Sequence, residues 1–191
     1  MRYLALLTLL FGSLLTAQPY APITASQRAK FFTDDTFGVR SLLLADPAVS
    51  AWRTWRGRPV EWDKNWEGFG KRYASRVTIN AITNGTEVSL GAIWKEDPRY
   101  FPKTGGTVKA RLTEAARQSV LSRYADGNYH IGAAKAAGMV AGSFGQKLFM
   151  PASVTSNGDC SIRAVGYVGA RFLSNLFEEF RPEIRKLFRR K

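Results

Sequence analysis

The chain has 191 residues, a length that suits a single domain with its own core. Its 28 Lys and Arg residues against 15 Asp and Glu give a formal net charge of +13, which favours an anionic partner, with a solubilising basic surface as the alternative. A single cysteine, Cys160, excludes a disulfide within the chain, and a single histidine, His130, excludes multi-histidine and HExxH metal sites.

Residues 1–17 have the pattern of a secretory signal peptide. Arg2 supplies the positive start, Tyr3–Leu15 form a short apolar stretch, and Thr16-Ala17 are small residues before the expected cut. The apolar stretch is shorter than the roughly 20 residues of a transmembrane helix. Leu15 stands where a small residue is preferred, so an uncleaved anchor is the alternative. We expect an exported protein of the periplasm or cell envelope.

Residues 18–50 are predicted to form an N-terminal helical segment. Thr24, Ser26 and Gln27 have the composition of a helix start. Asp46-Pro47 is expected to end the segment, because a residue before proline is steered away from helical geometry.

Residues 51–70 differ in kind, because four of the five tryptophans lie here among basic side chains. These residues are Trp52, Trp55, Trp62 and Trp66, with Arg53, Arg56, Arg58 and Lys64. Glycines and prolines interrupt the segment, so we expect a packed loop with short helical turns. Trp52 and Trp55 beside arginines suit a membrane–water interface. They also suit cation–π stacking inside the protein, and the structural interpretation is favoured.

Residues 71–180 are predicted to form the helical core. A helical apolar period runs from Lys71 to Trp94, where Asn84-Gly85 could interrupt it, and another runs from Val108 to Tyr124. The residues between them, 95–106, contain two prolines and a glycine pair and are expected to form a loop. Ile131–Phe149 is nearly free of charge and is expected to be a third helix.

Two series of small residues recur at four-residue spacing in this core. The first is Ala134, Gly138 and Gly142, and the second is Gly166, Ala170 and Ser174. Four residues is slightly more than one helical turn, so each series lines one helix face. Such faces let a second helix approach closely, and we expect these two helices to pack on each other.

The C-terminal stretch Ser161–Lys191 is the strongest amphipathic pattern, and Pro182 is expected to kink or restart the helix near Phe180. A basic helix with an apolar face can lie on an anionic membrane. The alternative is a core-packed helix with a solvated basic tail, residues 181–191. The candidate membrane or partner surface comprises Arg181, Arg185, Lys186, Phe188, Arg189, Arg190, Lys191, Trp52 and Trp55.

Catalytic motifs are weak in this chain. The string 141–145, AGSFG, resembles a nucleophile elbow around Ser143, but it begins with Ala and lies inside a helical pattern. Cys160 and His130 could form a thiolate–imidazolium pair only if folding joins them. The glycine-rich segments match neither a phosphate loop nor a dinucleotide fingerprint. We therefore expect no catalytic residue, no cofactor and no metal site, and favour a protein that is not an enzyme.

Two short segments carry a family resemblance. Gly68–Ser75 reads G-x-G-x-R-Y-A-S, and Glu96–Phe101 reads E-D-P-R-Y-F. Together they resemble a pattern in a family of uncharacterised exported bacterial proteins, in which helices rich in small residues follow. The resemblance covers about Trp62 to Met150 and leaves out the basic C-terminal helix. It implies a folded, exported family and assigns no catalytic residue.

The sequence thus predicts an all-α fold, one compact multi-helix domain with small-residue packing stripes after a signal peptide. The expected function is peripheral association with a membrane or another anionic envelope surface. A helical scaffold or subunit of an envelope protein complex is the first alternative, and a hydrolase acting on envelope lipid or wall is the second. Nucleic acid is not an expected partner outside the cytoplasm.

Overall fold

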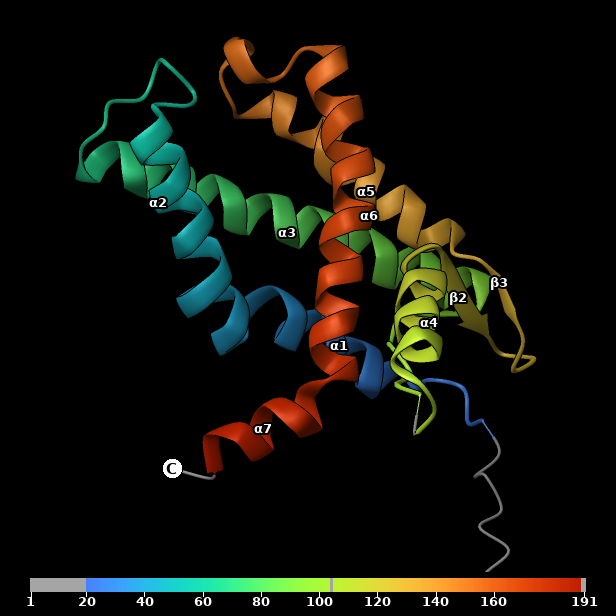
Figure 1. Ribbon diagram of the computed structural model, residues 1–191. Helices are drawn as coiled ribbons and strands as arrows, with labels where there is room; N and C mark the ends of the chain where they lie inside the picture. The colour runs from blue at the N-terminus through green and yellow to red at the C-terminus, as the bar shows by residue number, and fades with distance from the viewer. Residues whose placement is uncertain (1–19, 104, 190–191) are drawn as a thin grey trace, which may run out of the picture.

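The structure is a computed structural model that describes residues 20–103 and 105–189, with side chains described up to Leu187. The protein is mostly helical, which confirms the predicted fold class (Figure 1). The predicted signal peptide, residues 1–17, lies outside the described residues. Among the helices that are described, none combines the length and the apolar composition needed to cross a bilayer.

Long helices alternate with short turns and one small sheet. The α-helices are α1 (Ala25–Phe37), α2 (Asp46–Arg56), α3 (Trp66–Trp94), α4 (Val108–Val120), α5 (Ala133–Gly145), α6 (Asn157–Glu179) and α7 (Arg181–Arg189). The π-helical turn η1 (Arg40–Ala45) joins α1 to α2, and the 3-10 turns η2 (Gln146–Leu148) and η3 (Ala152–Val154) join α5 to α6. The strands are β1 (Glu96–Asp97), β2 (Leu121–Tyr124) and β3 (Tyr129–Ile131).

The first helices begin where local chemistry allows. Thr24 and Gln27 form a capping box at the start of α1, each side chain accepting a hydrogen bond from the other residue's backbone N–H. The expectation that Asp46-Pro47 ends a helix is wrong, because Asp46 is the first residue of α2. Pro47 then lies in the first turn, where its missing N–H breaks no helical hydrogen bond.

Helix α3 is the central element, and α1, α2 and α5 pack against it (Figure 1). Asn84-Gly85 does not interrupt α3, because the buried Asn84 amide donates to Thr36 Oγ1 of α1 at 3.0 Å. The small residues of α5 bring it close to α3: a Cβ at Gly138 would lie 2.5 Å from Thr83 O, and one at Gly142 would lie 1.9 Å from Thr83 Oγ1. The first small-residue series is therefore a helix-packing face.

The second series has no such role. Gly166 and Ala170 are exposed on α6, and a Cβ at Gly166 would meet nothing within 4 Å. Helices α5 and α6 pack on each other, as expected. The two small-residue series do not form that contact, because Gly138 of α5 faces α3 and Gly166 of α6 faces open space.

A three-stranded antiparallel sheet, in the order β1-β2-β3, was not expected from the sequence. Helix α4 ends at Val120 instead of Tyr124, since Leu121 takes an extended conformation and pairs with Ile131. Gly127, at φ +82°, makes the turn between β2 and β3. The sheet sets the position at which α5 begins.

The Trp/Arg-rich segment 51–70 is only partly a loop. Helix α2 extends through Arg56, and α3 begins at Trp66, so residues 57–65 alone connect them. Trp52 and Trp55 consequently lie on a helix. At the other end of the chain, α6 stops before Phe180 and α7 begins at Arg181, which confirms the restart expected from Pro182.

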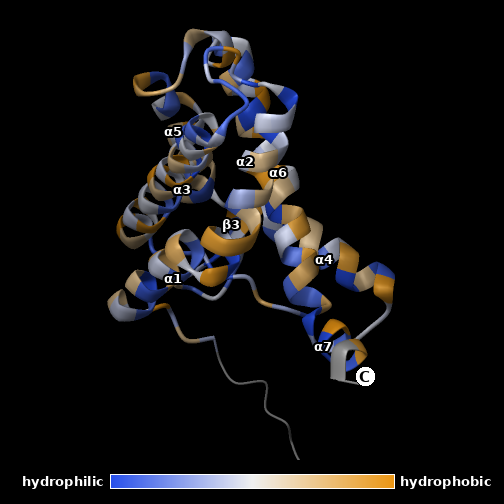
Figure 2. Ribbon diagram, turned by 90° about the vertical axis from the view of Figure 1, so that its left-hand side faces the viewer, coloured by the Kyte–Doolittle hydropathy of each residue, from blue (hydrophilic) through white to orange (hydrophobic). Residues whose placement is uncertain are grey.

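The interior is unusually polar. The buried apolar residues are Ile79, Ala115, Ala134, Met139, Met150 and Cys160, whereas the buried charged residues include Arg28, Asp46, Arg72, Glu87, Glu96, Asp97, Lys135 and Glu179. Large apolar side chains are instead exposed on several helices, and apolar residues recur along many of the helices in the ribbon coloured by hydropathy (Figure 2).

Lys135 is one of these interior charges. Its Nζ donates to the carbonyl oxygens of Gln118 at 2.8 Å and Leu121 at 2.9 Å, tying α5 to the end of α4. Burial, and then repulsion by Arg171, lowers the pKa of Lys135 to about 8. Glu87 of α3 accepts a hydrogen bond from Arg171 of α6, so paired charges also link the central helices.

Candidate membrane-facing surface

A groove of about 1070 Å³ opens between η1, α2 and the start of α3. Leu43, Leu44, Trp55, Trp66 and Phe69 form much of its lining. Trp66 is 86% exposed, and Trp55 and Leu43 are 67% and 66% exposed, so the rings and leucines face outward. We call this apolar surface the Trp groove.

Aromatic contacts hold the two tryptophans of α2 in place. The Trp52 and Trp55 rings lie 5.0 Å apart, and the Arg56 guanidinium lies 5.6 Å from the centre of the Trp52 ring. On α3, the Trp66 ring meets the edge of Phe69 at 5.8 Å. These contacts restrict the rings while leaving most of their surface open. The favoured expectation of stacking inside the protein is therefore wrong: Trp52 does stack with Arg56, but it and Trp55 are 56% and 67% exposed.

Basic side chains lie at and near the Trp groove. Arg56, Lys64 and Lys71 are exposed near the end of α2 and the start of α3. Lys71 forms an ion pair with Glu67 at 2.7 Å, and Lys64 lines the groove itself. An apolar, Trp-containing surface bordered by cations matches the chemistry of a membrane–water interface with anionic headgroups.

Arg72 fixes the connection between α2 and α3, and with it the position of Trp66. Its buried guanidinium donates to the carbonyl oxygens of Arg58 at 2.9 Å, Asp63 at 2.8 Å, Pro59 at 3.1 Å and Trp62 at 2.5 Å. Gly68 makes room for this arrangement, because a Cβ there would lie 1.9 Å from Asp63 O and 2.7 Å from Arg72 Nη1. Gly68 and Arg72 of the G-x-G-x-R pattern therefore have a structural role, whereas Gly70 has open space around it.

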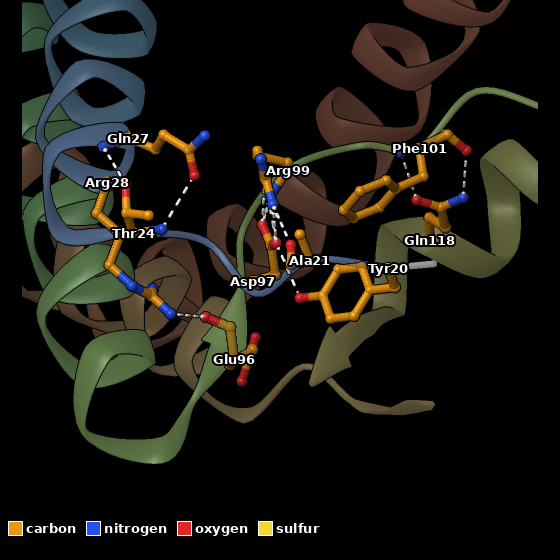
Figure 3. Close-up of polar contacts among 10 residues, drawn as sticks. All are labelled: Tyr20, Ala21, Thr24, Gln27, Arg28, Glu96, Asp97, Arg99, Phe101 and Gln118. Carbon is orange, nitrogen blue, oxygen red and sulfur yellow. Dashed lines mark hydrogen bonds and ion pairs between the residues drawn. The ribbon is translucent and has the colours of Figure 1, made fainter. Parts of the chain in front are cut away.

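The E-D-P-R-Y-F segment also has a structural role, beginning with Glu96. Its carboxylate accepts hydrogen bonds from Ala134 N at 2.8 Å and Tyr124 Oη at 3.0 Å, so it caps the start of α5. Arg28 of α1 donates from Nη2 to Glu96 O at 2.7 Å (Figure 3). Glu96 thus joins the N-terminal helix, the sheet and α5.

Asp97 and Tyr100 connect this junction to the first described residue, Tyr20, and to the end of α6. Asp97 accepts hydrogen bonds from Arg99 Nη2 at 2.6 Å and from Tyr20 Oη at 3.0 Å (Figure 3). Burial and the Asp97 carboxylate raise the pKa of Tyr20 to about 12, so its phenol stays a donor. Tyr100 Oη donates to Glu179 at 2.5 Å at the end of α6.

The C-terminal part of the predicted surface lies on α7. Arg185 and Lys186 are exposed, whereas Arg181 forms an ion pair with Glu178 at 3.1 Å. Arg40 of η1 also contacts Glu178, at 2.7 Å, so the end of α6 from which α7 departs lies against η1. The side chains of residues 188 and 189 and the whole of residues 190–191, and with them the predictions for Phe188, Arg189, Arg190 and Lys191, lie outside the described residues.

The nucleophile candidates do not form a catalytic site. Ser143 is buried in α5, and its Oγ has no hydrogen-bond partner. Cys160 is buried and free at the start of α6, while the exposed His130 contacts Asp126 at 3.1 Å on the sheet. The described part of the chain contains no group of three or more His, Cys, Asp and Glu that could hold a metal ion.

The sequence pointed to Trp52 and Trp55 as surface residues. It did not predict that Leu43, Leu44 and Trp66 lie together with Trp55 in one groove. The run of leucines before Asp46 carried a signal, since consecutive apolar residues on a helix cannot all face the interior. Comparison with family models, with curated proteins and with solved structures finds no match to this chain.

Proposed function

We propose that the protein is an exported, non-enzymatic component of the cell envelope that associates peripherally with an anionic membrane through the Trp groove. The observation that carries this proposal is the combination of Leu43, Trp55 and Trp66, all more than 60% exposed, with a border of basic side chains. Transfer of such rings from water to a membrane interface is favourable, because it removes apolar surface from water.

Helix α7 would add a second, electrostatic contact. Arg185 and Lys186 are exposed beside Leu187, and each cation near an anionic surface contributes on the order of 1 kcal/mol. Phe180 does not fit an insertion role, because it is half-buried under the Arg111 guanidinium, 4.2 Å from the ring centre. Apolar insertion is therefore assigned to the Trp groove, and long-range attraction is shared with α7.

Vesicle co-sedimentation at two salt concentrations tests the proposal. The protein beginning at residue 18 should sediment with vesicles that contain phosphatidylglycerol and much less with pure phosphatidylcholine. Arg185→Gln with Lys186→Gln should weaken binding at low salt and reduce its salt dependence, because salt screens exposed charges. Absence of binding to anionic vesicles by protein with a native helical spectrum would refute the proposal.

A second candidate, a subunit of an envelope complex, is favoured by the outer face of α6. Ile162, Val165 and Leu173 are 75%, 73% and 66% exposed, and Gly166 and Gly169 lie between them with open space around their Cα atoms. A smooth apolar stripe of this kind suits close approach of another helix. Gly166→Leu should leave the fold intact and abolish co-purification of a partner, whereas unchanged co-purification would exclude this face.

A further inference from the structure

Three arginines that form no ion pair with a described carboxylate line one cavity on the other side of α2 from the Trp groove. Arg53 of α2, Arg58 of the following loop and Arg163 of α6 line a cavity of about 220 Å³, together with Ser153 and Asp159. We call it the arginine pocket. An adjoining cavity of about 390 Å³ shares Arg163 and Asp159 and is also lined by Arg76 and Tyr167.

Some hydrogen-bond donors that line these cavities have no acceptor among the described residues. Arg163 donates from Nη2 to Val154 O at 3.2 Å, but its Nη1 is buried without a hydrogen-bond partner. The Tyr167 hydroxyl is likewise buried without one. Among the described residues, neither Arg53 nor Arg163 forms an ion pair, whereas Arg76 is committed to Asp46 at 3.1 Å. Buried donors without acceptors are uncommon in folded proteins and call for an explanation.

The nearby carboxylates offset the charge of the pocket only in part. Asp159 lines the cavity, and its pKa is lowered, first by its hydrogen bond from Ser156 and then by Arg163 and Arg58. Asp159 accepts from Ser156 N and Oγ and so completes the capping box of α6, in which Ser156 is the N-cap residue. Glu61 accepts from Ser153 Oγ at 2.6 Å. Neither forms an ion pair with Arg53, Arg58 or Arg163 among the described residues, so apart from the Arg163 Nη2 bond to Val154 O the guanidinium donors are open to an added anion.

This arrangement works against the stability of the free protein. Burial, followed by repulsion from Arg163 and Arg76, lowers the pKa of Arg53 to about 10. An anion placed between the guanidinium groups would reverse the repulsion and satisfy the vacant donors. Binding sites commonly hold like charges in this way, at a cost in stability that the ligand offsets.

We propose that the arginine pocket binds a phosphate-bearing anion through Arg53, Arg58 and Arg163. Guanidinium groups match the paired oxygens of phosphate, and the cavity has room for one phosphate group with a small substituent. Free phosphate and a phosphodiester headgroup share this chemistry. The site does not depend on the proposed membrane association, because it lies in a separate cavity and is tested without a membrane.

Calorimetric titration and thermal unfolding of the protein, with phosphate against chloride at matched ionic strength, test the site. Inorganic phosphate and monomeric dihexanoyl phosphatidylglycerol are the two probes. We expect at least one of them to bind and to raise Tm. Arg53→Gln and Arg163→Gln should each weaken that binding by about tenfold or more, whereas Lys30→Gln, which removes an exposed charge on α1, should not.

The pattern across probes identifies the ligand. Arginine-dependent binding of phosphate supports a free anion, and arginine-dependent binding of the short-chain lipid alone supports a headgroup. Arg163→Gln should also unfold at an equal or higher Tm in chloride, which distinguishes loss of a site from loss of the fold. Equal binding by Arg163→Gln, Lys30→Gln and the unmodified protein, or binding of neither probe, would overturn the proposal.

Discussion

Replacing Trp66 with alanine removes the most exposed ring of the Trp groove without touching the interior, because Trp66 is 86% exposed. A Trp side chain carries roughly 200 Å² of surface, so about 170 Å² is available for transfer to lipid. At about 25 cal/mol per Å², complete transfer contributes about 4 kcal/mol. A ring at headgroup level transfers about half of this, so Trp66→Ala should cost about 2 kcal/mol, or roughly 30-fold in the partition coefficient.

The chain offers a matched control in Trp94. It occupies the opposite end of the same helix, about 42 Å away at 1.5 Å per residue, and is 43% exposed. Co-sedimentation with vesicles of phosphatidylcholine and phosphatidylglycerol gives both partition coefficients, and circular dichroism verifies the fold of each variant. Trp94→Ala should bind as the unmodified protein does. Equal losses of vesicle binding for Trp66→Ala and Trp94→Ala, or no loss for Trp66→Ala, would refute membrane contact through the Trp groove.

Three further predictions concern the fold. In urea denaturation, Gly68→Ala should destabilise the protein by about 2–3 kcal/mol or more, because the added Cβ would collide with Asp63 O. Gly70→Ala should stabilise it by about 0.5–1 kcal/mol, because the space around Gly70 is open. The reverse order would contradict the assigned role of Gly68. The free energy of unfolding should rise from pH 8 to pH 10 by up to about 1.4 kcal/mol per pH unit. In this range Lys135 keeps its proton in the unfolded chain but has released it in the folded protein, where its pKa is lowered to about 8. Lys135→Met should remove that part of the rise, and an identical slope in the variant would count against the buried lysine. Gly138→Leu should destabilise by about 2 kcal/mol or more while Gly166→Leu leaves Tm unchanged, and equal shifts would contradict the packing of α5 on α3.

The helical class followed directly from apolar periodicity, and the restart at Pro182 followed from the geometry of proline. The sheet did not, because β1 and β3 are two and three residues long and exist only through pairing with β2. Pairing between distant segments leaves little trace in local composition. The Asn84-Gly85 dipeptide misled for a related reason, since a tertiary hydrogen bond to Thr36 overrides its turn preference.

The candidate surface was partly predictable. Composition marked Trp52 and Trp55, but only Trp55 lines the groove with Leu43 and Trp66, and that arrangement depends on how η1, α2 and α3 meet. The two small-residue series have the same spacing but different surroundings: Gly138 of α5 faces α3, whereas Gly166 of α6 faces open space. Spacing alone therefore does not predict what a helix face packs against. The arginine pocket left no local signal, since its three members come from two helices and a loop.

The most direct test of membrane association is the environment of position 66 when the protein meets lipid. Trp66→Cys, combined with Cys160→Ala and labelled with bimane, reports that environment through its emission wavelength. We expect a blue shift of the emission on adding anionic vesicles, and quenching by lipids that carry a nitroxide near the headgroup. An emission spectrum that stays unchanged while the labelled protein sediments with the same vesicles would contradict membrane contact at this position.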